Sequence, residues 1–497
     1  VLITPTRAVK LKRPVSLGFV DLSDAGRRRA LCAIEVALNR RLASDLYLGL
    51  APIIEGPDGV RLGDLLPDRD AQASGDAGPE LAVVMRAFDQ ASLWSNLVPA
   101  GGVGLDDARA LGHTIGEFHR DRARRCPDSP YGSAARFRRQ VLDNLDTLRG
   151  LPAAPGESAR LDAIDAAARS RHARLAPLRD ARNHDGFVRD GHGDLHLANI
   201  VTIAHRAVPF DCLEFDEGLR TVDVADDLAF AVMDLRHVGR PDLGWALVDG
   251  WLEATGDVDA LALLDDGVAY RAMVRAKIAA LSAHGAPTGA DERCQRYLCT
   301  AEAAGEHGPK VLVAMHGLSG SGKSVVSAVL GAVIGAVRLR SDVERKRLFG
   351  LEPTDHRGAH GAMYAEPARD AIYDHLAALA ARVLAFGTSV VVDASFLEHE
   401  HRARFASLAA ACDARFVIVD LQVPQTVLRA RLAARAARGT DPSDADTRVL
   451  ALQLRTHEPL DDAEQAGALV LGPQLAPTPE AIGAAWRAHL ARPAVAG

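Results

Sequence analysis

The sequence predicts two domains: a bilobal α+β domain, followed by an α/β domain built on a parallel sheet. First, at 497 residues the chain is too long for a single ordinary hydrophobic core. Second, strand-like and helical segments alternate downstream of about residue 310, whereas upstream a few short strands precede a mostly helical region. Third, the small, polar stretch "AEAAGEHGPK", Ala301 to Lys310, separates these two patterns and contains glycine and proline.

The expected elements follow from these patterns. Residues 1–305 are expected to form the first domain, with a small lobe at about 1–88 and a large helical lobe at about 89–305, and residues 310–497 the second. Hairpin-like strands are expected within Val1–Val15, Tyr47–Leu62 and Glu80–Phe88, and a mostly helical region from about Asp106 to His284. In the second domain, strands are expected to end near Met315, Arg340, Asp393, Leu421 and Leu471, with helices at Tyr364–Phe386, Glu398–Cys412 and Gln425–Arg438. Such alternation implies a parallel sheet with helices on both faces.

Composition excludes several classes of protein. The 58 basic and 65 acidic residues give a net charge of −7, which argues against a nucleic-acid binder held by net charge. The longest apolar run, Val325 to Val337, contains small residues and is expected to form a buried helix, not a membrane span. The closest cysteines, Cys294 and Cys299, lack the spacing of a zinc site. We therefore expect a cytoplasmic protein that contacts neither membrane nor nucleic acid; its oligomeric state is open.

The segment "GLSGSGKS", Gly317 to Ser324, fits the phosphate-loop pattern and lies between an apolar strand and a helix. Its backbone N–H groups can surround the phosphates of ATP at the positive end of that helix. The residues expected to form this cradle are Gly317, Ser319, Gly320, Ser321 and Gly322. Lys323 is expected to reach the β and γ phosphates, and Ser324 to bind Mg²⁺. The alternative is a chance Gly/Ser turn.

Two carboxylates follow strands of the same domain. Asp342, in "RLRSDVERKRLFG", is expected to end the second strand and to take a proton from a substrate hydroxyl; alternatively it caps a helix. Asp393 is expected to end the third strand, "SVVVDAS", and to hold the Mg²⁺ water shell.

An arginine-rich helix comes later in this domain. Arg431, Arg435 and Arg438 are spaced by four and three residues and therefore share one helix face. The following "GTDPSDAD" has the composition of a mobile loop, so the segment predicts a lid whose arginines neutralise charge on the transferred phosphate. The alternative is a solvated arginine face.

These motifs, together with "VVVDASF", resemble the small P-loop kinases that include gluconate kinase, polynucleotide 5′-kinase and zeta-toxin relatives. The resemblance covers Lys310 to about Leu471. It implies that Asp342 activates the acceptor hydroxyl and that Arg402 is the nearest candidate for a substrate-contacting arginine. The acceptor differs among members of this family, so its identity is open.

A second signature, "HGDLHLAN", spans His192 to Asn199 and has the spacing of a eukaryotic-like kinase catalytic loop. In such a loop Asp194 would accept the substrate proton and Asn199 would hold a metal ion. Asp211, in "AVPFDCLEF", follows as a second metal carboxylate. The alternative is a polar turn held by local hydrogen bonds.

The first half resembles the aminoglycoside phosphotransferase and choline kinase superfamily, which has a protein-kinase-like fold, over Val1 to about Gly285. The resemblance implies that Lys10 or Lys12 pairs with the nucleotide phosphates and that Glu35 anchors that lysine. It also implies that Asp223, Asp226 and Asp227 are structural. A glycine-rich phosphate cover is expected before the lysine strand, yet no glycine precedes Lys10; either that loop precedes the residues given or the fold holds ATP without it.

Three functions are consistent with these observations. The first is a fused, ATP- and Mg²⁺-dependent kinase that phosphorylates hydroxyl groups of a small molecule at two nucleotide sites. The second is a regulatory protein in which one domain is catalytic and the other senses nucleotide. The third is a polynucleotide 5′-kinase, which the acidic balance and the lack of a basic and aromatic patch disfavour.

Overall fold

The computed structural model describes residues 1–17, 20–57, 59–67, 78–151, 156–282, 289–352, 366–438 and 447–492. They form two compact units, Val1–Arg240 with Ala262–Gly305, and Pro241–Leu261 with Glu306–Gly497. Among the described residues no helix has both the length and the apolar character needed to cross a membrane.

A five-stranded antiparallel sheet and one helix begin the first unit. The strand order is β1 (Leu2–Ile3), β2 (Arg7–Leu11), β7 (Leu81–Arg86), β5 (Tyr47–Gly56) and β6 (Gly59–Leu62). A short hairpin of β3 (Ser16–Leu17) and β4 (Val20–Asp21) leads into α1 (Ala25–Ala43), whose N-terminus is capped by Asp24. Helix α1 packs on β5 and β7, and Cys32, Val36, Leu50 and Val83 are buried between them. The small lobe predicted from the sequence is therefore a sheet covered by α1.

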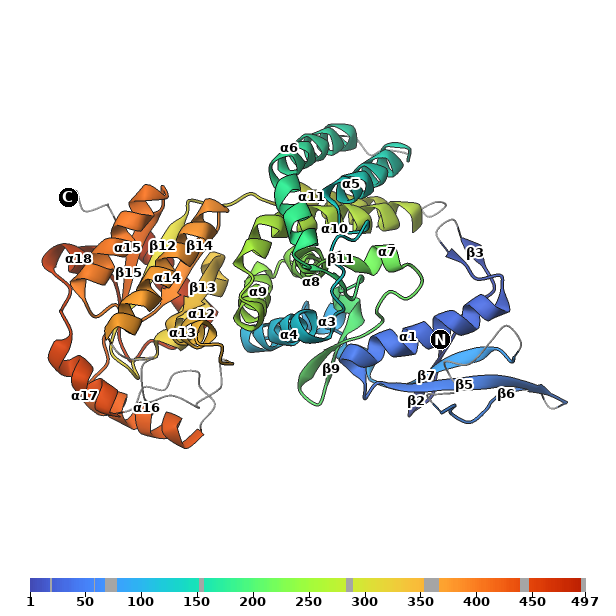
Figure 1. Cartoon of the computed structure of the whole chain (residues 1–497), viewed down its shortest axis with the longest axis horizontal. Helices are drawn as coiled ribbons and strands as arrows, with labels where there is room; N and C mark the ends of the chain where they lie inside the picture. The colour runs from blue at the N-terminus through green and yellow to red at the C-terminus, as the bar shows by residue number, and fades with distance from the viewer. Residues whose placement is uncertain are drawn as a thin grey trace. The chain divides into compact units, whose positions relative to one another are not determined.

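The rest of the first unit is mainly helical and contains two short two-stranded antiparallel sheets. Its helices are α3 (Trp94–Leu97), α4 (Leu105–Glu117), α5 (Ala134–Arg149), α6 (Glu157–His184), α7 (Glu217–Arg220), α8 (Val224–His237), α10 (Leu261–Ser282) and α11 (Gly289–Glu302). Strand β8 (Val188–Asp190) pairs with β11 (Thr221–Asp223), and β9 (Ile200–Ile203) pairs with β10 (Arg206–Pro209). The "HGDLHLAN" segment connects β8 to the β9–β10 hairpin, so it forms a loop between the two small sheets of the helical lobe (Figure 1).

A five-stranded parallel sheet forms the centre of the second unit. Its order is β13 (Ala336–Arg340), β14 (Ser389–Asp393), β12 (Val311–His316), β15 (Arg415–Leu421) and β16 (Leu469–Leu471). These strands end at the predicted positions or within one residue of them, which confirms the predicted α/β fold. The helices are α12 (Lys323–Ile334), α13 (Ser341–Leu348), α14 (Glu366–Ala385), α15 (His399–Ala411), α16 (Gln425–Arg438), α17 (Thr447–Thr456), α18 (Asp462–Gly467) and α19 (Pro479–Leu490). The connections from β12 to β13 and from β13 to β14 run in opposite directions along the sheet, so the right-handed rule for such crossovers puts α12 and α14 on opposite faces. Helix α14 contacts α15, and α12 contacts α19.

One segment departs from the predicted domain boundaries. Helix α9 (Pro241–Thr255) precedes the predicted break near residue 305, yet the second unit includes it. The physical reason is a pair of ionic contacts: Asp249 binds Arg338 of β13, with distances of 3.1 and 2.9 Å, and Glu253 binds Arg340 at the end of the same strand. Arg338 and Asp249 are both buried. The position of α9 in the sequence therefore does not show which unit it packs in.

Candidate active sites

The first candidate site is built on the loop between β8 and β9. Asp227, in the first turn of α8, accepts hydrogen bonds of 2.8 Å from the backbone N–H groups of His192 and Gly193, and lies 3.1 Å from Nε2 of His119. Burial alone would raise the pKa of Asp227, but the His119 contact and the backbone donors hold it below its ordinary value. A buried carboxylate thus fixes the loop, as the resemblance implied for Asp227. His119 was not predicted from the sequence, because it lies far along the chain from this loop and belongs to no motif.

Asp194 lies in this loop with its side chain partly exposed. Nδ2 of Asn199 donates to the carboxylate Oδ2 of Asp194 at 3.1 Å and to its carbonyl oxygen at 3.0 Å. Nε2 of His196 lies 3.4 Å from Oδ2 of Asp194. Burial would raise the pKa of Asp194, but His196 and other nearby cationic groups lower it. The carboxylate is therefore ionised near neutral pH and can accept a proton.

A network of ion pairs joins the sheet, α1 and the segment after β10. Nζ of Lys10 lies 2.9 Å from Oε1 of Glu35 and 2.6 Å from Oδ1 of Asp211, while Nζ of Lys12 lies 2.7 Å from Oε2 of Glu35 and binds Glu214. The Glu35 side chain is fully buried. Burial would lower the pKa of Lys10, but Glu35, Asp211 and Glu214 raise it above its ordinary value. Both lysines remain charged.

The two lysines lie in different surroundings, although the sequence pattern could not show which of them would reach the nucleotide. Lys10 is in β2, whereas Lys12 lies one residue beyond the strand, yet both reach Glu35. The side chain of Lys10 is 26% exposed and that of Lys12 only 6%. Lys10 is therefore the one that can reach a nucleotide phosphate, and Lys12 is enclosed by Glu35 and Glu214. Glu214 was part of "FDCLEF", but its pairing with Lys12 was not predicted.

The residues around Asp194 suit a magnesium ion. A carboxylate from Asp211 and an amide oxygen from Asn199 are hard oxygen ligands, which Mg²⁺ prefers. Asp211 is at a left-handed backbone position, φ 62°, directly after Phe210, whose N–H donates to the carbonyl oxygen of Asn199 at 2.9 Å. This hydrogen bond brings the segments of Asn199 and Asp211 together.

The second candidate site is the phosphate loop between β12 and α12. Gly317, Gly320 and Gly322 have φ values of 144°, 86° and 97°, which favour glycine, and a Cβ at Gly320 would lie 3.0 Å from the carbonyl oxygen of Leu428. Nζ of Lys323 donates to the carbonyl oxygens of Gly317 at 2.7 Å and Leu318 at 3.1 Å. The loop thus has the glycine geometry that a phosphate cradle requires.

Helices after β15 hold this loop. Nη1 of Arg431, on α16, donates to the carbonyl oxygen of Ser321 at 3.0 Å, and the N–H of Ser319 donates to Oε1 of Gln453, on α17, at 2.8 Å. Arg431 therefore lies against the loop, and Gln453 was not predicted. The side chains of Arg435 and Arg438, and residues 439–446, lie outside the described residues.

Asp393 ends β14 and is buried. Among the described residues, none donates a hydrogen bond to its Oδ2; Nε of Arg340 lies 3.8 Å away. A buried carboxylate oxygen without a hydrogen bond is costly unless a cation is near. Asp393 and the Ser324 hydroxyl at the start of α12 therefore suit Mg²⁺ as a set of oxygen ligands.

Two predicted positions need correction. Asp342 does not end a strand: β13 ends at Arg340, and Asp342 lies in the first turn of α13, paired with Nη1 of Arg345 at 3.0 Å. It is not the helix cap either, since Arg340 occupies that position. Ser341 begins the helix one residue after the strand, which shifts Asp342 from the strand end to the helix.

Arg402 is not available to a substrate. Its side chain is 1% exposed and donates to both carboxylate oxygens of Glu464, at 2.7 and 2.9 Å, and to the carbonyl oxygens of Phe396, Glu458 and Pro459. All five guanidinium hydrogens are therefore used inside the protein. The prediction that Arg402 contacts substrate was wrong, because Glu464 lies too far along the chain for local sequence to reveal the pair.

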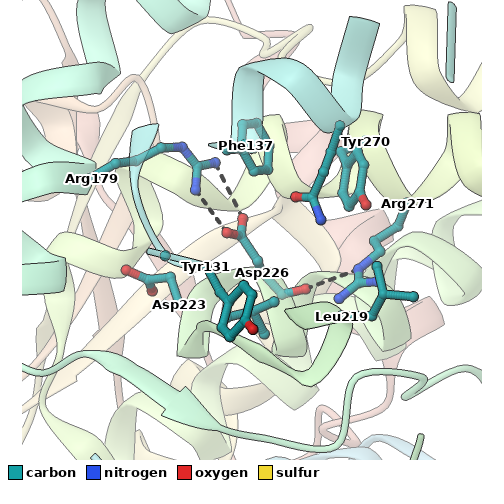
Figure 2. Close-up of a pocket in the computed structure, with 11 residues that line it drawn as sticks. Tyr131, Phe137, Arg179, Leu219, Asp223, Asp226, Tyr270 and Arg271 are labelled. Carbon is teal, nitrogen blue, oxygen red and sulfur yellow. Dashed lines mark hydrogen bonds and ion pairs between the residues drawn. The ribbon is translucent and has the colours of Figure 1, made fainter. Parts of the chain in front are cut away.

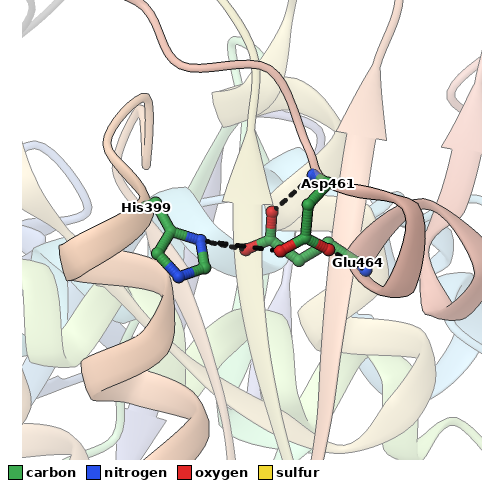
Figure 3. A group of neighbouring side chains, drawn as sticks. All are labelled: His399, Asp461 and Glu464. Atoms are coloured by element: carbon green, nitrogen blue, oxygen red, sulfur yellow. Dashed lines mark hydrogen bonds and ion pairs between the residues drawn. The ribbon is translucent and has the colours of Figure 1, made fainter.

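His399, Asp461 and Glu464 form a cluster (Figure 3), and Glu464 also binds Arg402. Nδ1 of His399 is 3.8 Å from Asp461 and 3.5 Å from Glu464. The carboxylates already have partners, since Glu464 binds Arg402 and forms a capping box with Asp461 at the start of α18. The cluster is explained by helix capping and an ion pair.

Comparison with known proteins identifies the family. The chain is 30% identical over 451 residues to the uncharacterized protein Rv2004c of Mycobacterium tuberculosis, covering 89% of this chain and 85% of that protein, and equally to a protein of Mycobacterium bovis. The chain belongs to this mycobacterial family. Residues 312–460 also match the family model of an AAA domain, AAA_33, and this region holds the phosphate loop.

Several solved structures are similar to parts of this chain. A sugar kinase from Janibacter is 22% identical over 38% of this chain and 99% of its own, with a TM-score of 0.29. An ethanolamine kinase from Plasmodium vivax is 10% identical over 59% of this chain and 75% of its own, with a TM-score of 0.36. An aminoglycoside phosphotransferase from Alicyclobacillus acidocaldarius is 14% identical over 59% of this chain and 89% of its own, with a TM-score of 0.34.

Proposed function

We propose that this protein is a fused ATP- and Mg²⁺-dependent phosphotransferase with two nucleotide sites, each transferring a phosphoryl group to a hydroxyl of a small molecule. The observation that carries the proposal is the position of Lys10, whose Nζ lies within 3 Å of both Glu35 and Asp211. A lysine held between a buried glutamate and an aspartate that can bind a metal ion is the arrangement that kinase-like sites use to hold nucleotide phosphates. A polar turn has no need of these three distant residues.

At the first site, Lys10 would bind the phosphates, and Asn199 and Asp211 would hold Mg²⁺, which neutralises charge on the phosphates when bound. Asp194 would accept the acceptor's hydroxyl proton as the new oxygen–phosphorus bond forms and the bond from the γ phosphorus to ADP breaks. The hydrogen bonds from Asn199 and the loop support from Asp227 fix the position of this carboxylate.

At the second site, Lys323 would move from the loop carbonyls to the phosphates, and Arg431 would add positive charge beside the loop. Ser324 and Asp393 would hold Mg²⁺. Asp342 stays the candidate base, in the first turn of α13, where its pairing with Arg345 orients the carboxylate.

The test is transfer of labelled phosphate from ATP, with Mg²⁺, to a panel of sugars, hydroxy acids, amino alcohols, nucleosides and 5′-hydroxyl oligonucleotides. We expect a phosphorylated small molecule, which should not form when EDTA is present. Labelled protein without labelled acceptor would support the regulatory alternative, and labelled oligonucleotide alone would support the polynucleotide kinase.

A further inference from the structure

A pocket in the first unit lies beside the catalytic loop and contains a buried arginine. Helices α5, α6, α8 and α10 and the segment from α7 to β11 form its walls, with Tyr131, Gln140, Tyr270 and Arg271 among the polar side chains that line it (Figure 2). The proposed chemistry uses none of these residues. All four side chains nevertheless line one pocket.

Arg271 lines this pocket with a buried guanidinium group whose hydrogen-bonding capacity is only partly used. The residue is 5% exposed, and its Nε donates to the carbonyl oxygen of Asp226 at 3.3 Å. Its Nη2 is buried, and no described residue accepts a hydrogen bond from it. A buried guanidinium nitrogen without an acceptor is costly, and binding an anion removes that cost.

The acidic side chains of the pocket already have cationic partners. Asp226 accepts two hydrogen bonds from Arg179, at 2.7 and 3.2 Å, and Asp223 accepts two from Arg182, at 2.8 and 2.9 Å. Arg179 also donates to Asp266, at 3.1 Å. In contrast, Arg271 donates to no carboxylate among the described residues, and its hydrogen bond goes to a backbone carbonyl oxygen.

A short chain of contacts connects Arg271 to the proposed base. The guanidinium carbon of Arg271 lies 4.8 Å from the centre of the Phe230 ring, and that ring meets the His196 ring edge to face at 5.4 Å. His196 in turn lies 3.4 Å from Asp194. One aromatic ring thus separates Arg271 from the residue that contacts the base.

From this arrangement we propose that the pocket binds an anionic group, a carboxylate or a phosphate ester, of the acceptor phosphorylated at the first site. The inference rests on the proposed function and names the substrate class for that site. Nη2 of Arg271 donates to the anion, and Tyr131, Tyr270 and Gln140, which line the same pocket, are the polar side chains that can add further hydrogen bonds. A cationic amino alcohol is repelled by Arg271 and is excluded.

The test separates binding from transfer, in the full chain carrying Lys323→Ala so that only the first site is observed. Calorimetry measures binding of inorganic phosphate, D-glycerate, glycerol and choline to protein saturated with MgADP, so that the nucleotide phosphate sites are already occupied. Phosphate and glycerate are expected to bind, Arg271→Met to weaken binding at least about tenfold, and Arg271→Lys to restore part of it. Arg139→Met, an exposed arginine on α5, is the matched control and should leave binding unchanged. Retained ATP binding shows that Arg271→Met folds.

Equal binding of glycerol or choline, or anion binding that survives Arg271→Met, overturns the pocket proposal. Tighter binding of glycerate than of phosphate assigns a carboxylate, and the reverse assigns a phosphate ester. Anion binding that needs Arg271, without transfer to any acceptor, leaves the pocket standing and contradicts the proposed function. Transfer to choline that is unchanged in Arg271→Met supports the proposed function and contradicts the pocket proposal.

Discussion

Nε of Arg340 lies 3.8 Å from Oδ2 of Asp393, the buried oxygen that is suited to Mg²⁺ at the second site. Arg340 does not close on Asp393, because its Nη1 donates to Glu253 of α9. Burial would lower the pKa of Arg340, but Glu253 and Asp393 raise it, so the guanidinium stays charged between two acids. Glu253 thus holds a competing cation away from the metal ligand.

Glu253→Gln should release Arg340 toward Asp393 and raise the Mg²⁺ concentration needed for tight nucleotide binding by about tenfold, with little change in metal-free binding. The measurement is a Mg²⁺ titration of a fluorescent ADP analogue in the Lys10→Met background, which weakens nucleotide binding at the first site. Asp259→Asn, which removes an acid of the same unit paired with Arg382, should leave the titration unchanged. An identical Mg²⁺ midpoint in Glu253→Gln would show that Arg340 does not compete.

Lys10 and Lys12 are predicted to have different roles despite sharing Glu35. Lys10→Met should lower kcat/KM for ATP at the first site by about 100-fold, because it removes a cation that can reach the phosphates. Lys12→Met should lower it by about tenfold, since Lys12 is enclosed by Glu35 and Glu214 and acts through the position of Glu35. Steady-state kinetics in the Lys323→Ala background measures both. The reverse ranking would assign the phosphate contact to Lys12.

Asp227→Asn should destabilise the first unit by about 2 kcal/mol at pH 7, because the carboxylate no longer accepts from the loop and from His119. The pKa of Asp227 is lower in the folded protein than its ordinary value of about 3.9. The charge therefore stabilises the fold fully above that value, and this contribution falls as pH drops toward the folded pKa. The difference in the free energy of unfolding between the unsubstituted protein and Asp227→Asn should therefore decrease by about 1 kcal/mol from pH 7 to pH 3.

The measurement is urea unfolding followed by ¹⁹F NMR of fluorotryptophan-labelled protein, in which the signal of buried Trp94 reports on the first unit. A difference that stays constant with pH would contradict a lowered pKa for Asp227.

Features that depend on a short stretch of sequence, such as strand ends and the phosphate loop, were predicted well. Apolar runs gave the ends of β13, β14 and β15, because a buried parallel strand is a continuous apolar segment. Glycines whose conformation needs φ above zero gave the phosphate loop. The pairing of Lys10 with Glu35 followed from the family resemblance.

Contacts between distant residues were not predictable in this way. Arg402 pairs with Glu464, and α9 packs on β13, through tertiary contacts that leave no periodic pattern. The Asp342 prediction failed because the change from strand to helix occurs between Arg340 and Ser341, and boundaries depend on one or two residues. Arg271 was missed because its burial, and not its spacing, makes it notable.

If the chain has two independent phosphotransfer sites, one substitution at each site should separate their activities. Asp194→Asn and Lys323→Ala are made separately, and transfer of labelled phosphate from ATP is measured against the same acceptor panel. We expect each substitution to abolish phosphorylation of one acceptor and to leave that of another intact. Loss of every activity with Lys323→Ala, and no change in any with Asp194→Asn, would contradict this expectation.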